Sequence, residues 1–129
     1  MQDRPDAPEL LAAVAVWLAE DLAPGLPRDQ RFLARVAANC CAIAAREAAA
    51  GPALAAAEAE RLAALLGPGA EVEPTPAGLR AAQRDLARAI RAGEHDARLG
   101  ATAAALRESV RAKLDIARPG YDAVADDGR

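Results

Sequence analysis

Apolar residues recur along this chain at the spacing of α-helices, and glycine or proline separates the helical stretches. The longest unbroken pattern runs from Gln30 to Gly51. Residues three, four and seven apart share one face of a helix, and here that row holds Phe32, Val36, Asn39, Ile43 and Ala50. A second row widens the face: Leu33, Ala37, Cys40 and Ala44. So broad an apolar stripe predicts a central helix with this face in the core of a small helical bundle.

Capping and stop signals divide the rest of the chain. Asp6 with Glu9 three residues on resembles a capping box, and Thr75 before Pro76 is a good helix start. Glycine and proline supply the stops. The sequence predicts five helices, over residues 6–22, 28–50, 52–66, 76–92 and 96–117. Their short connections favour antiparallel neighbours. We therefore expect an all-α, five-helix, up-and-down antiparallel bundle, with one domain over 3–119 and a frayed acidic tail over 120–129.

The same spacing predicts which side chains face inward in the last three helices. The third helix buries Leu54, Leu62, Leu65 and Leu66 and turns Glu58, Glu60 and Arg61 toward water. The fourth buries Leu79, Ala82, Leu86 and Ile90. The fifth has a near-heptad row of Leu99, Ala103, Leu106, Val110, Leu114 and Ala117.

Composition supports helices but indicates a thin core. Hydrophobic residues make up 53% of the chain, yet 38 of them are alanine, the best helix former. Buried alanine stabilises far less than buried leucine or valine, so self-association into a homodimer is plausible. No stretch has the ~18–20 apolar residues of a membrane span. The acidic N-terminus, MQDRPDAPE, lacks the basic region of a signal peptide. We expect a cytoplasmic protein that does not enter a membrane.

Charge alternates along the chain around a net value of −3. Residues 1–27 sum to −4, 28–51 to +2, 52–75 to −3, 76–118 to +4 and the remainder to −2. An acidic protein of this kind is not expected to bind nucleic acid. The alternation is typical either of helices that pair through their flanks or of ordinary solvated surfaces.

The chain has few residues that could carry chemistry. Cys40 and Cys41 are adjacent on a helix, where a disulfide would be strained, so we interpret them as small buried apolar residues. His95 is the one histidine and is expected in an exposed link between the last two helices. Metal-ligand spacings, a phosphate-binding glycine loop and a nucleophile elbow are missing from the sequence. The sequence therefore predicts no metal site, no cofactor and no enzyme activity of its own.

Two features are candidate binding sites. Asn39 lies on the predicted core face, where its amide needs hydrogen-bond partners. It either fixes helix register, as buried asparagine does in coiled coils, or contacts a ligand in a pocket. The second feature is a row of arginines at spacings of four, four and three: Arg80, Arg84, Arg88 and Arg91. This arginine row either forms salt bridges across a solvated surface or binds a phosphate, a carboxylate or an acidic partner.

Four segments carry a resemblance to a known family. They are DRPDAPELLAAVAVWL, FLARVAANCCAIAARE, DLARAIRAGEHD and LRESVRAKLDIARP. Together they resemble a bacterial helical domain of unknown function, over approximately residues 3–119. Members of that family tend to be encoded beside, or fused to, aminoglycoside-phosphotransferase-like kinases and acyl-CoA dehydrogenases. The resemblance implies an accessory role in acyl-CoA or related small-molecule metabolism, and it assigns no catalytic residues.

The leading hypothesis is therefore a small helical protein that binds a partner. That partner would be a kinase-like protein, an acyl-CoA dehydrogenase-like protein or a second copy of the chain. The alternative is a ligand-binding domain in which the arginine row takes the phosphate of a CoA or of a phosphorylated metabolite.

Overall fold

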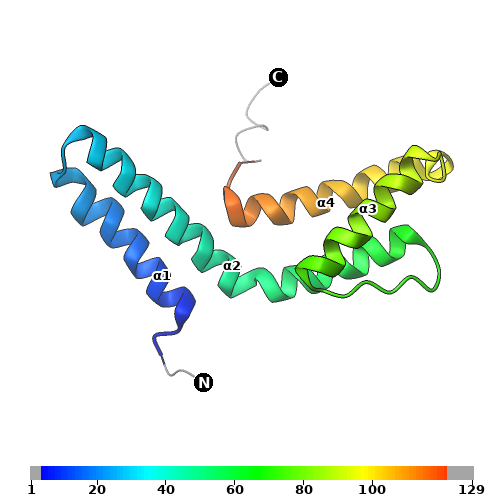
Figure 1. The fold of residues 1–129 in the computed structure, drawn as a ribbon, viewed down its shortest axis with the longest axis horizontal. Helices are drawn as coiled ribbons and strands as arrows, with labels where there is room; N and C mark the ends of the chain where they lie inside the picture. Colours follow the sequence, from blue (N-terminus) through cyan, green and yellow to red (C-terminus); the bar gives the residue numbers. More distant parts are fainter. Residues whose placement is uncertain (1–3, 122–129) are drawn as a thin grey trace. The chain divides into compact units, whose positions relative to one another are not determined.

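The structure of the protein, a computed structural model, describes residues 4–121. These residues form four α-helices, α1 (Ala7–Val16), α2 (Arg28–Leu66), α3 (Pro76–Arg91) and α4 (Leu99–Ala117), and no strand (Figure 1). Short π- and 3₁₀-helical segments, Trp17–Leu22, Ala23–Gly25 and Asp96–Arg98, extend or join them. None of the helices in this described part is both long enough and apolar enough to cross a bilayer. The predicted all-α class is confirmed.

The prediction of five helices is wrong, because α2 continues through Gly51 and Pro52. Proline inside a helix has no N–H to donate and crowds the carbonyl four residues earlier, which here belongs to Ala48. The helix continues across this defect, but the defect still marks a boundary. The chain divides into two compact units between Gly51 and Pro52. The single domain predicted over 3–119 stays a prediction, and most of the predicted tail over 120–129 lies outside the described residues.

The first unit is a helical hairpin, which we call the hairpin: α1 and its extension run beside residues 28–51 of α2 (Figure 1). The predicted capping box is confirmed, since Asp6 accepts from the Glu9 N–H at 3.0 Å and Glu9 accepts from the Asp6 N–H at 2.9 Å. Pro24 and Gly25 lie in the short 3₁₀ segment that ends this arm. The apolar side chains buried within the hairpin are all alanines: Ala15, Ala23, Ala34, Ala38 and Ala45.

The second unit has a leucine core. Leu62, Leu65, Ala82 and Leu86 form a buried cluster, with Leu79 and Ile90 among the partly buried residues packed against it. This outcome confirms the inward face predicted for 76–92 and the inward leucines Leu62, Leu65 and Leu66 of 52–66, but Glu58, predicted to face water, is buried. Thr75 caps α3 as predicted, with its hydroxyl accepting from the Gly78 N–H at 3.1 Å. Gly78 has no room for a side chain, because a Cβ there would lie 2.5 Å from the Glu73 carbonyl oxygen.

The face predicted for the last helix is rotated in the structure. α4 begins at Leu99, after a 3₁₀ turn at Asp96, so Asp96 does not cap it. Its buried residues are Thr102 and Ser109, whereas Leu99 and Val110 are 58% and 55% exposed. Two polar groups therefore occupy the inward positions of α4, and each meets a polar partner in this unit.

Candidate functional site

The hairpin leaves many of its large apolar side chains exposed, while Leu11, Leu18 and Leu22 are partly buried. The exposed ones on α1 and its extension are Leu10, Val14, Val16 and Trp17, and those on α2 are Phe32, Leu33 and Val36. The predicted core row is therefore wrong in its first half, where Phe32 is 67% exposed and Val36 and Asn39 are exposed, whereas Ile43 and Ala50 are partly buried. Cys40, in the second predicted row, is exposed as well. Cys41, beside it, is only partly buried. Asn39 is exposed and needs no protein partner, so the buried register role is not supported, and the ligand contact stays a prediction.

Most of these outward side chains lie on one side of the hairpin. Leu10, Val14 and Trp17 each precede by one residue the inward row of α1, to which Ala15 belongs. Leu33 likewise precedes the buried Ala34 on α2. Successive residues of a helix point about 100° apart. Because the two helices are antiparallel, the residues that precede the inward rows of both helices point to the same side of the hairpin. We call Leu10, Val14, Trp17 and Leu33 the hairpin face, with Phe32 and Val36 along its α2 edge.

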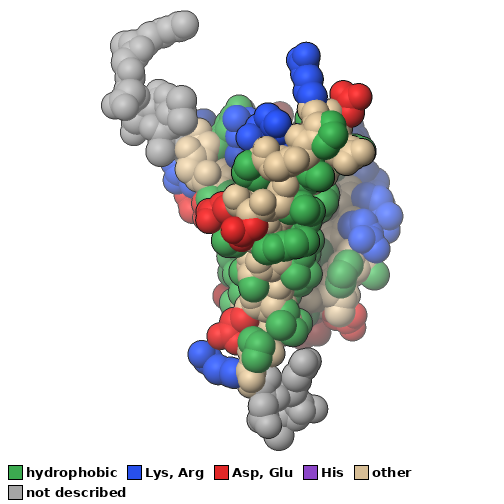
Figure 2. Space-filling model, turned by 90° about the vertical axis from the view of Figure 1, so that its left-hand side faces the viewer, with side chains coloured by type: hydrophobic (Ala, Val, Ile, Leu, Met, Phe, Trp, Pro, Cys, Tyr) green, Lys and Arg blue, Asp and Glu red, His purple; other side chains and the backbone are tan. Residues whose placement is uncertain are grey.

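Hydrophobic side chains gather along much of the side of the molecule that Figure 2 shows. Acidic, basic and other atoms lie between them in this view. Clusters of exposed large apolar side chains mark interaction sites where they form one patch. One cause of the exposure lies in the hairpin interior, where the apolar residues that are fully buried in the described part are alanines. Small side chains let the two helices approach closely, so Leu11, Leu18 and Leu22 are only partly buried and many other large side chains stay exposed.

A polar cluster crosses the core of the second unit. Glu58, predicted to face water, is buried, with 8% of its surface exposed. Its carboxylate forms an ion pair with Arg61 and accepts from the Ser109 hydroxyl at 2.7 Å. Gln83 on α3 donates to the other carboxylate oxygen at 3.5 Å. A buried carboxylate needs such compensation, and the cluster joins α2, α3 and α4.

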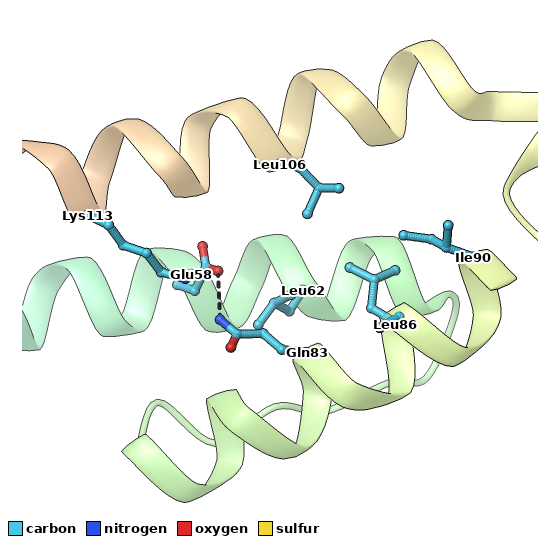
Figure 3. A pocket seen from close by; sticks show the side chains of 8 residues that line it. Glu58, Leu62, Gln83, Leu86, Ile90, Leu106 and Lys113 are labelled. Atoms are coloured by element: carbon cyan, nitrogen blue, oxygen red, sulfur yellow. Dashed lines mark hydrogen bonds between the residues drawn. The ribbon is translucent and has the colours of Figure 1, made fainter. Parts of the chain in front are cut away.

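A pocket of about 230 Å³ opens beside this cluster. Figure 3 shows Glu58, Gln83 and Lys113 toward one end and leucine and isoleucine side chains toward the other. The apolar lining comes from Leu62, Leu86, Ala87, Ile90 and Leu106. The Lys113 side chain makes no hydrogen bond or ion pair with the part of the chain that the structure describes.

His95 is a further correction to the sequence interpretation. It is 2% exposed rather than a loop residue in water, and its Nδ1 lies 2.9 Å from the Thr102 hydroxyl. This buried pair fastens the link after α3 to the first turns of α4. Arg98, from the same link, donates to the Leu65 carbonyl at 2.8 Å and so satisfies a terminal carbonyl of α2. Both contacts have a structural role.

The arginine row lies on the exposed side of α3. Arg80, Arg84, Arg88 and Arg91 are all exposed, and Arg88 forms an ion pair with Asp85 three residues earlier. Neither the pocket beside the polar cluster nor the pocket lined by Ala59, Val72 and Pro74 includes any of the four. The structure therefore places these arginines together on one exposed surface.

Within residues 4–121, no group of three or more His, Cys, Asp or Glu side chains is placed to hold a metal ion. Fold and surface together define a small all-helical protein with an exposed apolar hairpin face and a polar cluster in its leucine core. Residues 24–121 match the family described as a domain of unknown function, DUF6285, and the chain belongs to that family. The matched residues include α2, α3 and α4 and leave α1 outside. No curated protein and no solved structure matches the chain.

Proposed function

We propose that this protein is a helical accessory protein that acts as a pair of copies joined through their hairpin faces. The observation that supports the proposal is the inverted hairpin, with alanine inside and Leu10, Val14, Trp17 and Leu33 outside. Fully burying a large apolar side chain stabilises by roughly 1.5–3 kcal/mol. Covering four such side chains from each copy would therefore favour association strongly, even after its entropic cost.

The charges of the hairpin favour a second copy as the occupant of this face. Residues 4–27 carry a net charge of −3, and residues 28–51 carry +2. If two hairpins pack face to face about a two-fold axis parallel to their helices, each helix lies antiparallel to the oppositely charged helix of the other copy. The result would be a four-helix bundle in which both copies contribute the same residues to the interface.

The family resemblance suggests the biological role of such a pair. It would be an accessory protein to an acyl-CoA dehydrogenase-like or kinase-like protein. That role rests on the resemblance alone. The alternative function, binding of a CoA or a phosphorylated metabolite by the arginine row, is supported by the exposure of the four guanidinium groups. The apolar hairpin face adds support for pairing and none for that alternative, so pairing is the function proposed.

The test is the mass of the protein in solution, measured by sedimentation equilibrium over a range of concentrations. We expect a species of twice the 13.3 kDa of one chain. The double variant Trp17→Glu with Leu33→Glu should sediment as a single chain and keep its helical circular dichroism, because both side chains are already half exposed.

Leu99→Glu is the matched control, since Leu99 is 58% exposed but lies on α4. It should pair as the unmodified protein does. A single-chain mass at every concentration would refute the proposal. Pairing that survives the hairpin double variant would also refute it, because another surface would then hold the copies together.

A further inference from the structure

The pocket in the second unit is a separate feature from the hairpin face. Leu62 and Leu86 are 1% and 3% exposed and form its apolar wall with the partly buried Ile90. Leu106, across from them on α4, is 36% exposed although it lines the same space (Figure 3). An apolar side chain that faces a cavity without filling it leaves room for an apolar guest.

The polar end of the pocket carries one uncompensated positive charge. The Glu58 carboxylate forms an ion pair with Arg61 and accepts a hydrogen bond from Ser109, so its negative charge is already compensated within the protein. The Lys113 ammonium has no such partner among the described residues. Gln83 uses one amide N–H for Glu58 and has a second N–H to donate.

We propose that this pocket binds a short aliphatic carboxylate. Its carboxylate would pair with the Lys113 ammonium and accept from the Gln83 amide, while its chain would lie among Leu62, Leu86 and Leu106. A charge-assisted hydrogen bond to the head gives orientation, and apolar burial of the tail gives affinity. An amine of the same length has the wrong charge for the Lys113 end.

Size restricts the guest to a short chain. The pocket measures about 230 Å³, below the ~300–1,000 Å³ typical of sites for drug-sized ligands. Butyrate and hexanoate are therefore suitable probes, and acetate, which has the head without the tail, tests whether the apolar wall contributes.

Methyl NMR of the full chain tests the site directly. The chain has three isoleucines, Ile43, Ile90 and Ile116, and only Ile90 lines the pocket. In protein labelled at isoleucine δ1-methyl groups, hexanoate should move the Ile90 signal in a saturable way. The signals of Ile43 and Ile116 should stay in place, and neither acetate nor hexylamine should reproduce the shift.

Two variants on α4 separate a specific head contact from general electrostatics. Lys113→Gln should weaken hexanoate binding about tenfold or more, because it removes a charge-assisted contact. Arg107→Gln removes the same charge from an exposed residue that does not line the pocket, and it should bind as the unmodified protein does. Lys113→Arg should retain binding.

Three results would each overturn the proposal. The first is an Ile90 signal that does not respond to hexanoate or butyrate at saturating concentration. The second is an equal response to hexylamine, which would show that charge at Lys113 is irrelevant. The third is equal binding by the Lys113→Gln and Arg107→Gln variants. None of these readouts depends on whether two copies pair through their hairpins.

Discussion

The two units of this chain distribute their apolar side chains in opposite ways. The hairpin buries five alanines and exposes Trp17, Phe32 and Leu33, whereas the second unit buries Leu62, Leu65 and Leu86. Buried leucines stabilise a fold by themselves, and buried alanines do little more than allow close contact between helices. The comparison indicates that the second unit can account for its own stability and that the hairpin depends on what covers it.

The units differ in their polar residues as well. The leucine core of the second unit includes the buried Glu58 carboxylate, which pairs with Arg61, and the buried His95–Thr102 pair. Buried polar groups are tolerated only when they are paired. Here Ser109 of α4 reaches Glu58 of α2, and His95 in the link reaches Thr102 of α4. No polar side chain is buried in the described part of the hairpin. Specific polar contacts therefore define the arrangement of the second unit, while alanine packing defines that of the hairpin.

The largest effect is expected from the leucine core. Leu62→Ala should lower the free energy of unfolding by about 2–5 kcal/mol, because it opens a cavity at a side chain that is 1% exposed. Urea denaturation of the purified variant measures the change. Leu99→Ala, at a leucine that is 58% exposed, is the control and should shift stability by roughly 0.5 kcal/mol or less. Equal losses in the two variants would contradict the assignment of the core.

The polar cluster gives the next effect. Glu58→Gln should destabilise by about 1–3 kcal/mol, because Arg61 and Ser109 then face a neutral amide in a buried setting. Glu60→Gln makes the same substitution two residues away at an exposed position and should have little effect. A double-mutant cycle of Glu58→Gln with Ser109→Ala measures their coupling. Additive losses would mean that the hydrogen bond between them contributes nothing.

An effect of similar or smaller size is expected in the hairpin interior. Ala38→Leu inserts a large side chain between the two helices at a position that is 6% exposed, and overpacking typically costs about 1–3 kcal/mol. Ala37→Leu places the same side chain on the exposed neighbouring position and should be neutral or stabilising. Thermal unfolding followed by circular dichroism compares them. A stabilising Ala38→Leu would show that the hairpin interior is underpacked rather than closely packed.

The contrast between the units also explains which sequence predictions succeeded. Around Leu62 and Leu86 the leucines are the main large apolar residues, so helical spacing identifies the buried face. In residues 28–51, alanines occupy every side of the helix, and two rows compete for the interior. Spacing favours the row of Phe32 and Val36, but the structure buries the row of Ala34 and Ala38. Periodicity identifies an apolar row without showing which row a neighbouring helix can approach closely.

Contacts between distant residues account for the remaining errors. Glu58 and Arg61 are recognisable in the sequence as a pair three residues apart, but Ser109 meets them from 51 residues beyond Glu58. The burial of His95 likewise follows from its Thr102 contact and from the path of the link before α4. Predictions that depend on residues close in sequence were reliable at the helix caps Asp6 and Thr75, where the capping hydrogen bond joins residues three apart. Gly51–Pro52 is one exception, because α2 continues through this stop signal, and Asp96 is another, because it does not cap α4.

The smallest effects test whether the two units unfold separately. Asp6→Ala removes the cap of α1 and Thr75→Ala removes the cap of α3, and each should cost about 1 kcal/mol. If the defect at Gly51–Pro52 uncouples the units, Asp6→Ala will shift only the unfolding of the hairpin. Thr75→Ala will then shift only the unfolding of the leucine core. Hydrogen exchange resolved along α2 distinguishes the two, because its residues 28–51 belong to one unit and 52–66 to the other.

If either substitution instead increases exchange equally along the whole of α2, the helix transmits stability across Pro52 and the chain unfolds cooperatively. The difference between the alanine hairpin and the leucine core would then be one of composition only. Separate responses would mean that the two units unfold independently of one another. The protection of the hairpin should then rise with protein concentration as copies pair, while that of the leucine core stays constant.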